Sequence, residues 1–209
     1  MSLRIARTPP LAAGLLLAAT LSAPPARALD LGAPLPARTV AMRNVDGRPV
    51  TIAATRGAKG TLVLFTCNHC PWVRAWEERF VRIGNEARTR GIGMIAINSN
   101  DPSAYPEDAF DAMQERAKSH GYRFPYAEDA TSEVARAFGA THTPEAYLFD
   151  AGGRLVYHGT VDDDARHPDQ VRQHFLADAV AAVAQGRAVP VAETKALGCG
   201  IVLRPAAQE

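Results

Sequence analysis

The sequence lacks a second long hydrophobic run and lacks any cluster of basic residues, and each absence excludes a class of protein. One apolar run lies near the start, at residues 11–23, and no later run reaches the roughly 18 residues that a membrane helix needs. A polytopic membrane protein is therefore excluded. No stretch concentrates lysine or arginine on one face, so we expect no nucleic-acid partner.

The chain is also poor in cysteine, with only Cys67, Cys70 and Cys199. A structural disulfide framework uses pairs, so an odd number leaves one thiol free, transient or bound to another chain. Cys67 and Cys70 are too close together for a crosslink between them to restrict much of the unfolded chain. We therefore expect this pair to cycle between dithiol and disulfide rather than to stabilise the fold.

Residues 1–28 have the pattern of a secretory signal peptide. Arginines supply a positive start, residues 11–23 form the apolar centre, and Ala26 and Ala28 place small side chains where signal peptidase reads them. We expect cleavage after Ala28 and a periplasmic or other extracytoplasmic protein with no integral membrane domain in its mature form. An uncleaved membrane anchor is the alternative. In both cases the domain meets an oxidising compartment.

Loss of residues 1–28 removes three arginines and no acid, so the formal net charge falls from +1 to −2. The 181 residues that remain fit one domain that buries its core without disulfides. Composition divides them into an irregular segment at 29–37, a folded domain at 38–187 and a C-terminal tail at 188–209 that carries the third cysteine. The chain contains no internal repeat, low-complexity tract or interdomain linker.

The hydrophobic pattern alternates short apolar runs with amphipathic stretches, which predicts an α/β fold with a layered sheet. The turn signals at Asp46-Gly47 and at 150–153 predict two hairpins, and the second adds antiparallel strands to the sheet. Expected strands lie at 39–42, 50–52, 61–65, 92–97, 124–126, 146–149 and 154–157, and expected helices at 71–90, 106–121, 134–138 and 168–185.

The C-x-x-C pair lies where the expected strand at 61–65 gives way to the expected helix at 71–90. Zinc sites use the same spacing, but zinc needs two further ligands and no second closely spaced Cys or His pair exists. Haem attachment is excluded because Pro71, not histidine, follows the second cysteine. We expect no cofactor and no resident metal.

This strand-to-helix junction resembles the active site of the thioredoxin superfamily, and Thr143-Pro144 resembles its cis-proline loop. Residues 66–73 and 124–145 are similar to the redoxin, or peroxiredoxin-like (alkyl hydroperoxide reductase/thiol-specific antioxidant-like), branch. The resemblance covers residues 31–185. It implies a thioredoxin-like central mixed β-sheet flanked by helices, with an N-terminal β-hairpin extension. It also implies that Pro144 is cis and that the backbone of Thr143 pairs with an extended substrate peptide.

In such a fold we expect Cys67 to be the nucleophile, because it lies nearest the exposed start of the helix, where unpaired N–H groups and the helix dipole lower a thiol pKa. Cys70 would then be the resolving thiol. Pro71 leaves open which cysteine caps the helix, since proline favours the first helical position and moves the preceding residue away from helical conformation. His69 beside the pair favours thiolate, which stabilises the reduced form and makes the disulfide a better oxidant. The alternative for His69 is a solvent-facing side chain with little effect.

The expected function is that of an exported thiol-disulfide oxidoreductase that exchanges electrons through Cys67 and Cys70. Its partners would be protein thiols or disulfides, a small thiol or peroxide, and a redox partner protein. A peroxiredoxin-like peroxidase is the alternative, but peroxiredoxins carry proline and a Thr or Ser seven and three residues before the reactive cysteine. Gly60 and Leu64 occupy those positions before Cys67.

A second alternative is a copper carrier that uses the two cysteines with a histidine such as His142 or His158, because soft thiolates suit Cu(I). Cys199 stays open between three roles. It could be a third redox thiol that resolves a Cys67 disulfide or sulfenate, a link to a partner chain, or an inert tail thiol.

Overall fold

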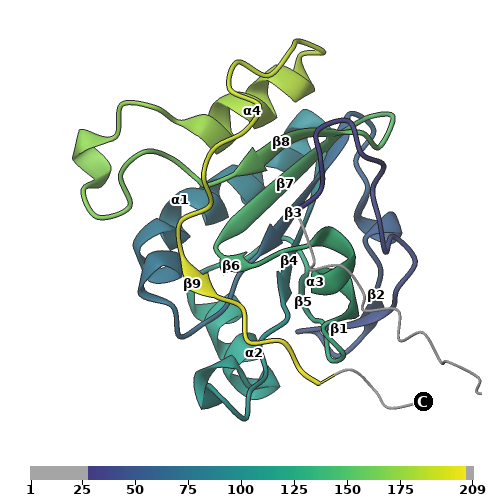
Figure 1. Cartoon of the computed structure of the whole chain (residues 1–209), viewed down its shortest axis with the longest axis vertical. Helices are drawn as coiled ribbons and strands as arrows, with labels where there is room; N and C mark the ends of the chain where they lie inside the picture. The colour runs from purple at the N-terminus through teal and green to yellow at the C-terminus, as the bar shows by residue number, and fades with distance from the viewer. Residues whose placement is uncertain (1–27, 206–209) are drawn as a thin grey trace, which may run out of the picture.

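The computed structural model describes residues 28–205, in which a mixed sheet of seven strands lies between two layers of helices (Figure 1). Nearly all of the expected signal peptide, residues 1–27, lies outside this range. Within residues 28–205, no helix is both long and apolar enough to span a bilayer. The strands are β1 (Met42–Asn44), β2 (Pro49–Val50), β3 (Gly60–Phe65), β4 (Ile92–Asn98), β5 (Tyr126–Glu128), β6 (His142–Thr143), β7 (Glu145–Asp150), β8 (Leu155–Gly159) and β9 (Cys199–Gly200).

In the described part of the chain, four α-helices and four short 3-10 helices connect these strands. The α-helices are α1 (Pro71–Ala87), α2 (Phe110–Ser119), α3 (Glu133–Phe138) and α4 (Phe175–Ala184), and the 3-10 helices are η1 (Ala53–Thr55), η2 (Arg88–Arg90), η3 (Pro106–Asp108) and η4 (Pro168–Gln170). The expected helix at 71–90 therefore ends as η2, and Gly91 closes it in the left-handed conformation at φ 83°.

The order of the main sheet is β2-β1-β5-β4-β3-β7-β8, with β6 and β9 forming a separate two-stranded sheet. At its centre β3 pairs in parallel with β4 and antiparallel with β7. All six residues of β3 are buried, as expected for a strand covered on both faces. Mixed strand directions with helices on both faces confirm the predicted thioredoxin-like architecture.

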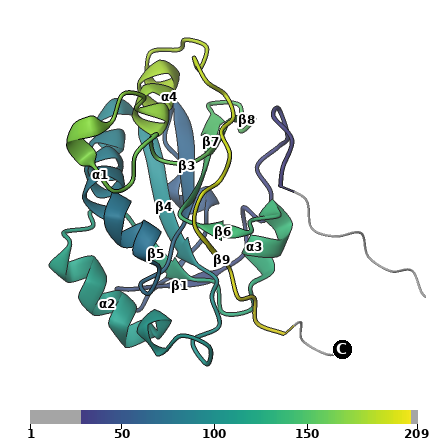
Figure 2. The same cartoon turned by 60° about the vertical axis from the view of Figure 1, so that its left-hand side comes forward.

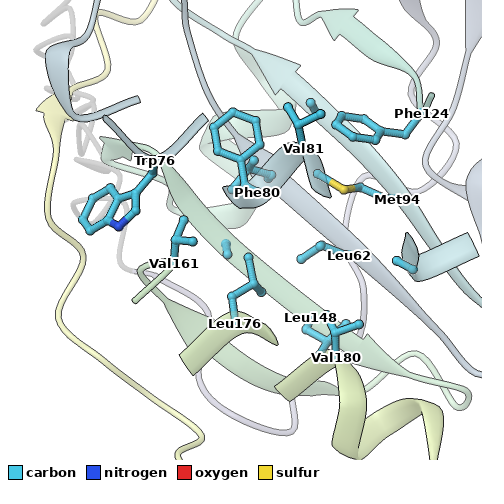
Figure 3. Packing of buried hydrophobic residues seen from close by; sticks show 14 of the residues in the cluster. Leu62, Trp76, Phe80, Val81, Met94, Phe124, Leu148, Val161, Leu176 and Val180 are labelled. Carbon is cyan, nitrogen blue, oxygen red and sulfur yellow. The ribbon is translucent and has the colours of Figure 1, made fainter. Parts of the chain in front are cut away.

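Alternate residues of the central strands feed two separate cores, because successive side chains of a strand point to opposite faces. Leu62 of β3 belongs to the core beneath α1, α2 and α4, where Trp76 and Phe80 of α1 meet Leu176 of α4 (Figure 3). Val63 belongs to the core beneath α3 and the N-terminal segment. Because β3 is packed on both faces, its end has a fixed position, and the Cys67–Cys70 turn begins there.

The predicted N-terminal hairpin exists as β1 and β2, and β1 also pairs with β5, so the hairpin extends the main sheet at one edge. One prediction of secondary structure needs correction. The expected helix at 168–185 is broken, since Val171 is extended and only η4 and α4 are helical. The Asp163 carboxylate accepts the N–H groups of Arg172 and Gln173 at 3.0 and 3.2 Å and so holds that segment out of helical conformation.

The C-terminal segment after α4 is part of the fold rather than a loose tail. It runs across the ends of the central strands, where β9 lies beside β6 (Figure 2). Earlier in the segment, the N–H of Thr194 donates to the carbonyl of His158 at 3.0 Å. Later, the N–H of Val202 donates to Asn100 Oδ1 at 2.8 Å.

Candidate active site

The Cys67–Cys70 turn leaves β3 and enters α1. Just after β3 ends, the N–H of Thr66 donates to the carbonyl of Ile97 in β4 at 2.9 Å, which anchors the start of the turn. Cys70 is the N-cap residue of α1, with ψ 123°, because Pro71 takes the first helical position. Cys70, rather than Cys67, therefore lies at the helix N-terminus.

The loop before β7 faces this turn, and the Thr143–Pro144 peptide bond is cis, which confirms the isomer implied by the resemblance. Cys67 Sγ lies 3.1 Å from Thr143 Oγ1, and Cys70 Sγ lies 3.2 Å from the carbonyl oxygen of Thr143. The structure thus brings together Cys67, Cys70, Thr143 and Pro144, which were assigned to one site from sequence.

The two thiols are fully buried, with 0 % of either residue exposed, and they interact directly. The hydrogen bond from Cys67 is the largest influence on Cys70, and together with hydrogen bonds from Cys199 and the Val73 N–H it lowers the pKa of Cys70 to about 4, against the effect of burial. The same hydrogen bond, burial and the carboxylate of Asp108 raise the pKa of Cys67. The pair therefore loses one proton easily and retains the second.

This pKa order is opposite to the one expected from sequence, where Cys67 was the thiolate. The physical reason lies in Pro71, which places the helix N-terminus at Cys70, and in Asp108, whose negative charge disfavours a thiolate on Cys67. Cys70 is therefore the more acidic thiol of the pair and Cys67 the less acidic one.

His69 does not face solvent as an inert side chain. Its Nδ1 lies 2.6 Å from Asp108 Oδ2, and its ring stacks on Tyr105 with centroids 3.7 Å apart and planes 7° apart. The other oxygen of Asp108 accepts the N–H of Asn68 at 2.6 Å. Asp108 therefore holds the middle of the turn in place and adds a negative charge beside Cys67.

Among residues 28–205, Cys67, His69 and Asp108 form the one group whose ligand atoms converge closely enough for a metal, all within 4.8 Å of one another. The copper-carrier alternative named His142 or His158 instead. The structure places both histidines in other contacts, His142 with Thr141 and His158 with the carboxylate of Glu145. Neither belongs to the converging group.

Glu145 secures the cis-proline loop from beneath. One carboxylate oxygen accepts the N–H groups of Thr141 and His142 at 2.9 and 3.0 Å, and the other contacts His158 Nε2 at 2.7 Å and Tyr147 at 2.9 Å. Burial would raise the pKa of Glu145, but the hydrogen bonds from His158 and the two N–H groups outweigh burial and lower it. A buried carboxylate thus fixes the backbone that leads into Thr143.

Cys199 also reaches the site, through β9. Thr143 and Cys199 are directly paired in the β6–β9 ladder, and the thiol of Cys199 interacts with that of Cys70. Burial and the interaction with Cys70 raise the pKa of Cys199 to about 12. The third cysteine is therefore a neighbour of the pair and not a remote tail thiol.

Comparison with known proteins matches residues 31–158 to the AhpC/TSA family, which is more than half of the chain. The chain belongs to the AhpC/TSA family. A structure of an uncharacterised conserved protein from Geobacillus kaustophilus is 35 % identical, with a TM-score of 0.76 over 87 % of this chain and 95 % of that chain. That relative shows that the architecture extends over nearly the whole domain.

Two further comparisons concern redox proteins. The thiol-disulfide oxidoreductase ResA of Halalkalibacterium halodurans is 23 % identical over 115 residues, which span 55 % of this chain and 61 % of that relative. A thiol:disulfide interchange protein of the thioredoxin family from Chlorobium tepidum is 24 % identical, with a TM-score of 0.52 over 64 % of this chain and 90 % of that chain. The second likeness shows the thioredoxin-like fold.

Sequence reasoning missed two buried acids that shape this AhpC/TSA site. Neither Asp108 nor Glu145 was predicted from sequence to be a site residue. Both are 1 % exposed. The one available signal was the position of Glu145 directly after Pro144, since Asp108 reaches the turn from η3, 40 residues after Asn68.

Proposed function

We propose that this protein is an exported thiol-disulfide oxidoreductase that exchanges electrons through Cys67 and Cys70. The observation that carries the proposal is the direct interaction of two buried thiols, both in contact with Thr143 beside a cis-proline, with the pKa of Cys70 lowered to about 4. Export rests on the leader pattern of residues 1–28.

The proposed direction is oxidation of substrate thiols. A thiolate stabilised in the reduced protein makes the corresponding disulfide a stronger oxidant, and a low-pKa thiol leaves readily from a disulfide. The Cys67–Cys70 disulfide would accept a substrate thiolate at Cys67 and release Cys70 as the thiolate. A second substrate thiol would then attack the mixed disulfide at the substrate sulfur, forming a substrate disulfide and returning Cys67 to its protonated form.

Oxidised protein spanning residues 29–209 should convert a reduced test peptide with two cysteines to its disulfide. We expect Cys70→Ser to lower this rate about a hundredfold or more, because it removes one sulfur of the disulfide. Thr66→Val is a matched control, since Thr66 is buried beside Cys67 and its hydroxyl has no hydrogen-bond partner within the described residues. It should retain activity.

Two parallel assays separate this proposal from other chemistry at the same site. Hydrogen peroxide consumption with a thiol donor, lost in Cys67→Ser and unaccompanied by peptide oxidation, would instead establish a peroxidase. Stoichiometric bound metal, with peptide oxidation unchanged in both serine variants, would instead establish a metal-binding role. Either result overturns the proposal.

A further inference from the structure

Strand β9 occupies the edge of β6 next to the cis-proline. His142 pairs with Gly200 and Thr143 with Cys199, and the N–H of Ile201 donates to the carbonyl of Thr141 at 2.9 Å. The protein's own C-terminal segment thus lies along the backbone that the proposed function would offer to an extended substrate.

This segment is held on both sides of Cys199. Before it, the N–H of His158 donates to the carbonyl of Ala192 at 3.0 Å. After it, the guanidinium of Arg204 contacts Glu128 at 3.0 Å and the carbonyl of Asp129 at 2.6 Å. Anchors at both ends give the Cys199 sulfur a fixed position at the dithiol rather than a chance contact.

The close approach of Cys199 to Cys70 depends on the glycine at position 198. A Cβ added to Gly198 would lie 2.1 Å from the carbonyl oxygen of Thr143 and 3.3 Å from the nitrogen of Pro144. A Cβ added to Gly200, on the other side of Cys199, would meet no atom nearer than 4.0 Å, at the carbonyl of Thr141. Residue 198 must therefore lack a side chain for Cys199 to reach Cys70.

The three sulfurs differ in access. Cys67 and Cys70 are completely buried, whereas Cys199 is partly exposed. Cys199 is therefore the most exposed of the three cysteines. Cys70 Sγ lies 3.2 Å from the carbonyl oxygen of Thr143, and Thr143 pairs directly with Cys199, so Cys70 and Cys199 both adjoin Thr143.

We propose that Cys199 is a third redox-active thiol, which takes over the disulfide from Cys67 by exchange at Cys70 and presents it to external thiols. This inference rests on the proposed oxidoreductase function and adds the route by which electrons enter the buried pair. It also assigns the substrate class as thiols that attack a strand-held disulfide, without a need to displace β9.

Each step is a thiol-disulfide exchange that conserves atoms and electrons. The deprotonated Cys199 sulfur attacks Cys70 Sγ, the bond between Cys70 and Cys67 breaks, and Cys67 leaves with the electron pair and takes up a proton. An external thiolate then attacks Cys199 Sγ and Cys70 leaves as the thiolate. A second external thiolate releases the external disulfide, and Cys199 recovers a proton. Two external thiols are oxidised, and one protein disulfide is reduced.

The Cys67→Ser variant retains only Cys70 and Cys199 and so isolates the proposed second disulfide. In a glutathione redox buffer, oxidised glutathione should form a mixed disulfide at Cys199, and Cys70 should displace the glutathione to close a Cys70–Cys199 disulfide, which peptide mass spectrometry maps. The matched variant Cys70→Ser, which retains Cys67 and Cys199, should close its disulfide at least about tenfold less readily, because its sulfurs have a lower effective concentration. Circular dichroism checks that both variants fold, and Cys67→Ala serves as a second variant.

Gly198→Ala in the Cys67→Ser background should reduce the yield of the Cys70–Cys199 disulfide about tenfold, whereas Gly200→Ala should leave it unchanged. The inference is overturned if folded Cys67→Ser keeps Cys70 and Cys199 as free thiols or glutathione adducts, or if both glycine variants behave alike. Failure of the proposed function is a different result: the crosslink forms normally, but the wild-type chain oxidises no peptide.

Discussion

Cys70 Sγ lies 3.2 Å from the carbonyl oxygen of Thr143, which joins the head of α1 to the cis-proline loop at the same point where β9 pairs with that loop. One short contact therefore links three segments that are far apart in the chain. The chemistry of the site depends on this meeting of segments as much as on the C-x-x-C spacing.

The reduced protein should carry a thiolate well below neutral pH. Hydrogen bonds from Cys67 and Cys199 lower the pKa of Cys70 to about 4, so the ultraviolet thiolate absorbance should persist from about pH 8 to about pH 6 and fall with a midpoint near 4. Because the folded pKa is depressed, the thiolate stabilises the fold fully above the unfolded cysteine pKa of about 8.5, and this contribution is lost as the pH falls through 4. The signal should be absent in Cys70→Ser. A midpoint near 8.5 in the wild-type protein would contradict this assignment.

Removal of the Asp108 charge should make Cys67 more acidic. In a Cys70→Ser background, Asp108→Asn should lower the pKa of Cys67, and alkylation of Cys67 by iodoacetamide at pH 8 should become several-fold faster. Asparagine keeps an oxygen that accepts the Asn68 N–H, so the turn should stay in place. Glu107→Gln alters an exposed neighbouring acid and is the matched control. Equal alkylation rates in the two variants would show that the carboxylate has no influence on Cys67.

Glu145→Gln should destabilise the protein by about 3 kcal/mol at pH 7, because it removes a buried charge that holds His158 and two loop N–H groups. Hydrogen bonds lower the pKa of Glu145, so its contribution is present above the unfolded pKa of 4.5 and is lost as the pH falls below that value. Urea unfolding should thus show a smaller difference between the two proteins in acid. Tyr147→Phe removes a single hydrogen bond to Glu145 and should cost only about 1 kcal/mol. A constant difference at every pH would rule out the charged-carboxylate explanation.

The central fold could be predicted from sequence because its signals are local. The buried run of β3, the apolar stripe of α1 and the turn at Asp150–Gly153 each depend on residues close together in the chain. The break after η4 could not be predicted, since the residues at 171–174 continue a helical pattern and the contact that holds them extended comes from Asp163.

Part of the candidate site could also be predicted from local sequence signals. The dithiol and Thr143-Pro144 have a recognisable arrangement in sequence, and the structure brings them together. The relative pKa values of Cys67 and Cys70 could not be predicted from sequence, because they depend on Asp108 and Cys199, which reach the turn from distant segments. The two-residue strand β9 is too short to have a periodic pattern of its own.

The reduction potential of the mature protein, measured by equilibration with glutathione and mapped by mass spectrometry, tests the central claim most directly. The account predicts one reversible two-electron transition that includes Cys70, is lost in Cys70→Ser, and lies well above the thioredoxin value of about −270 mV because the Cys70 thiolate stabilises the reduced form. A potential at or below that value, or an unchanged transition in Cys70→Ser, would contradict the account.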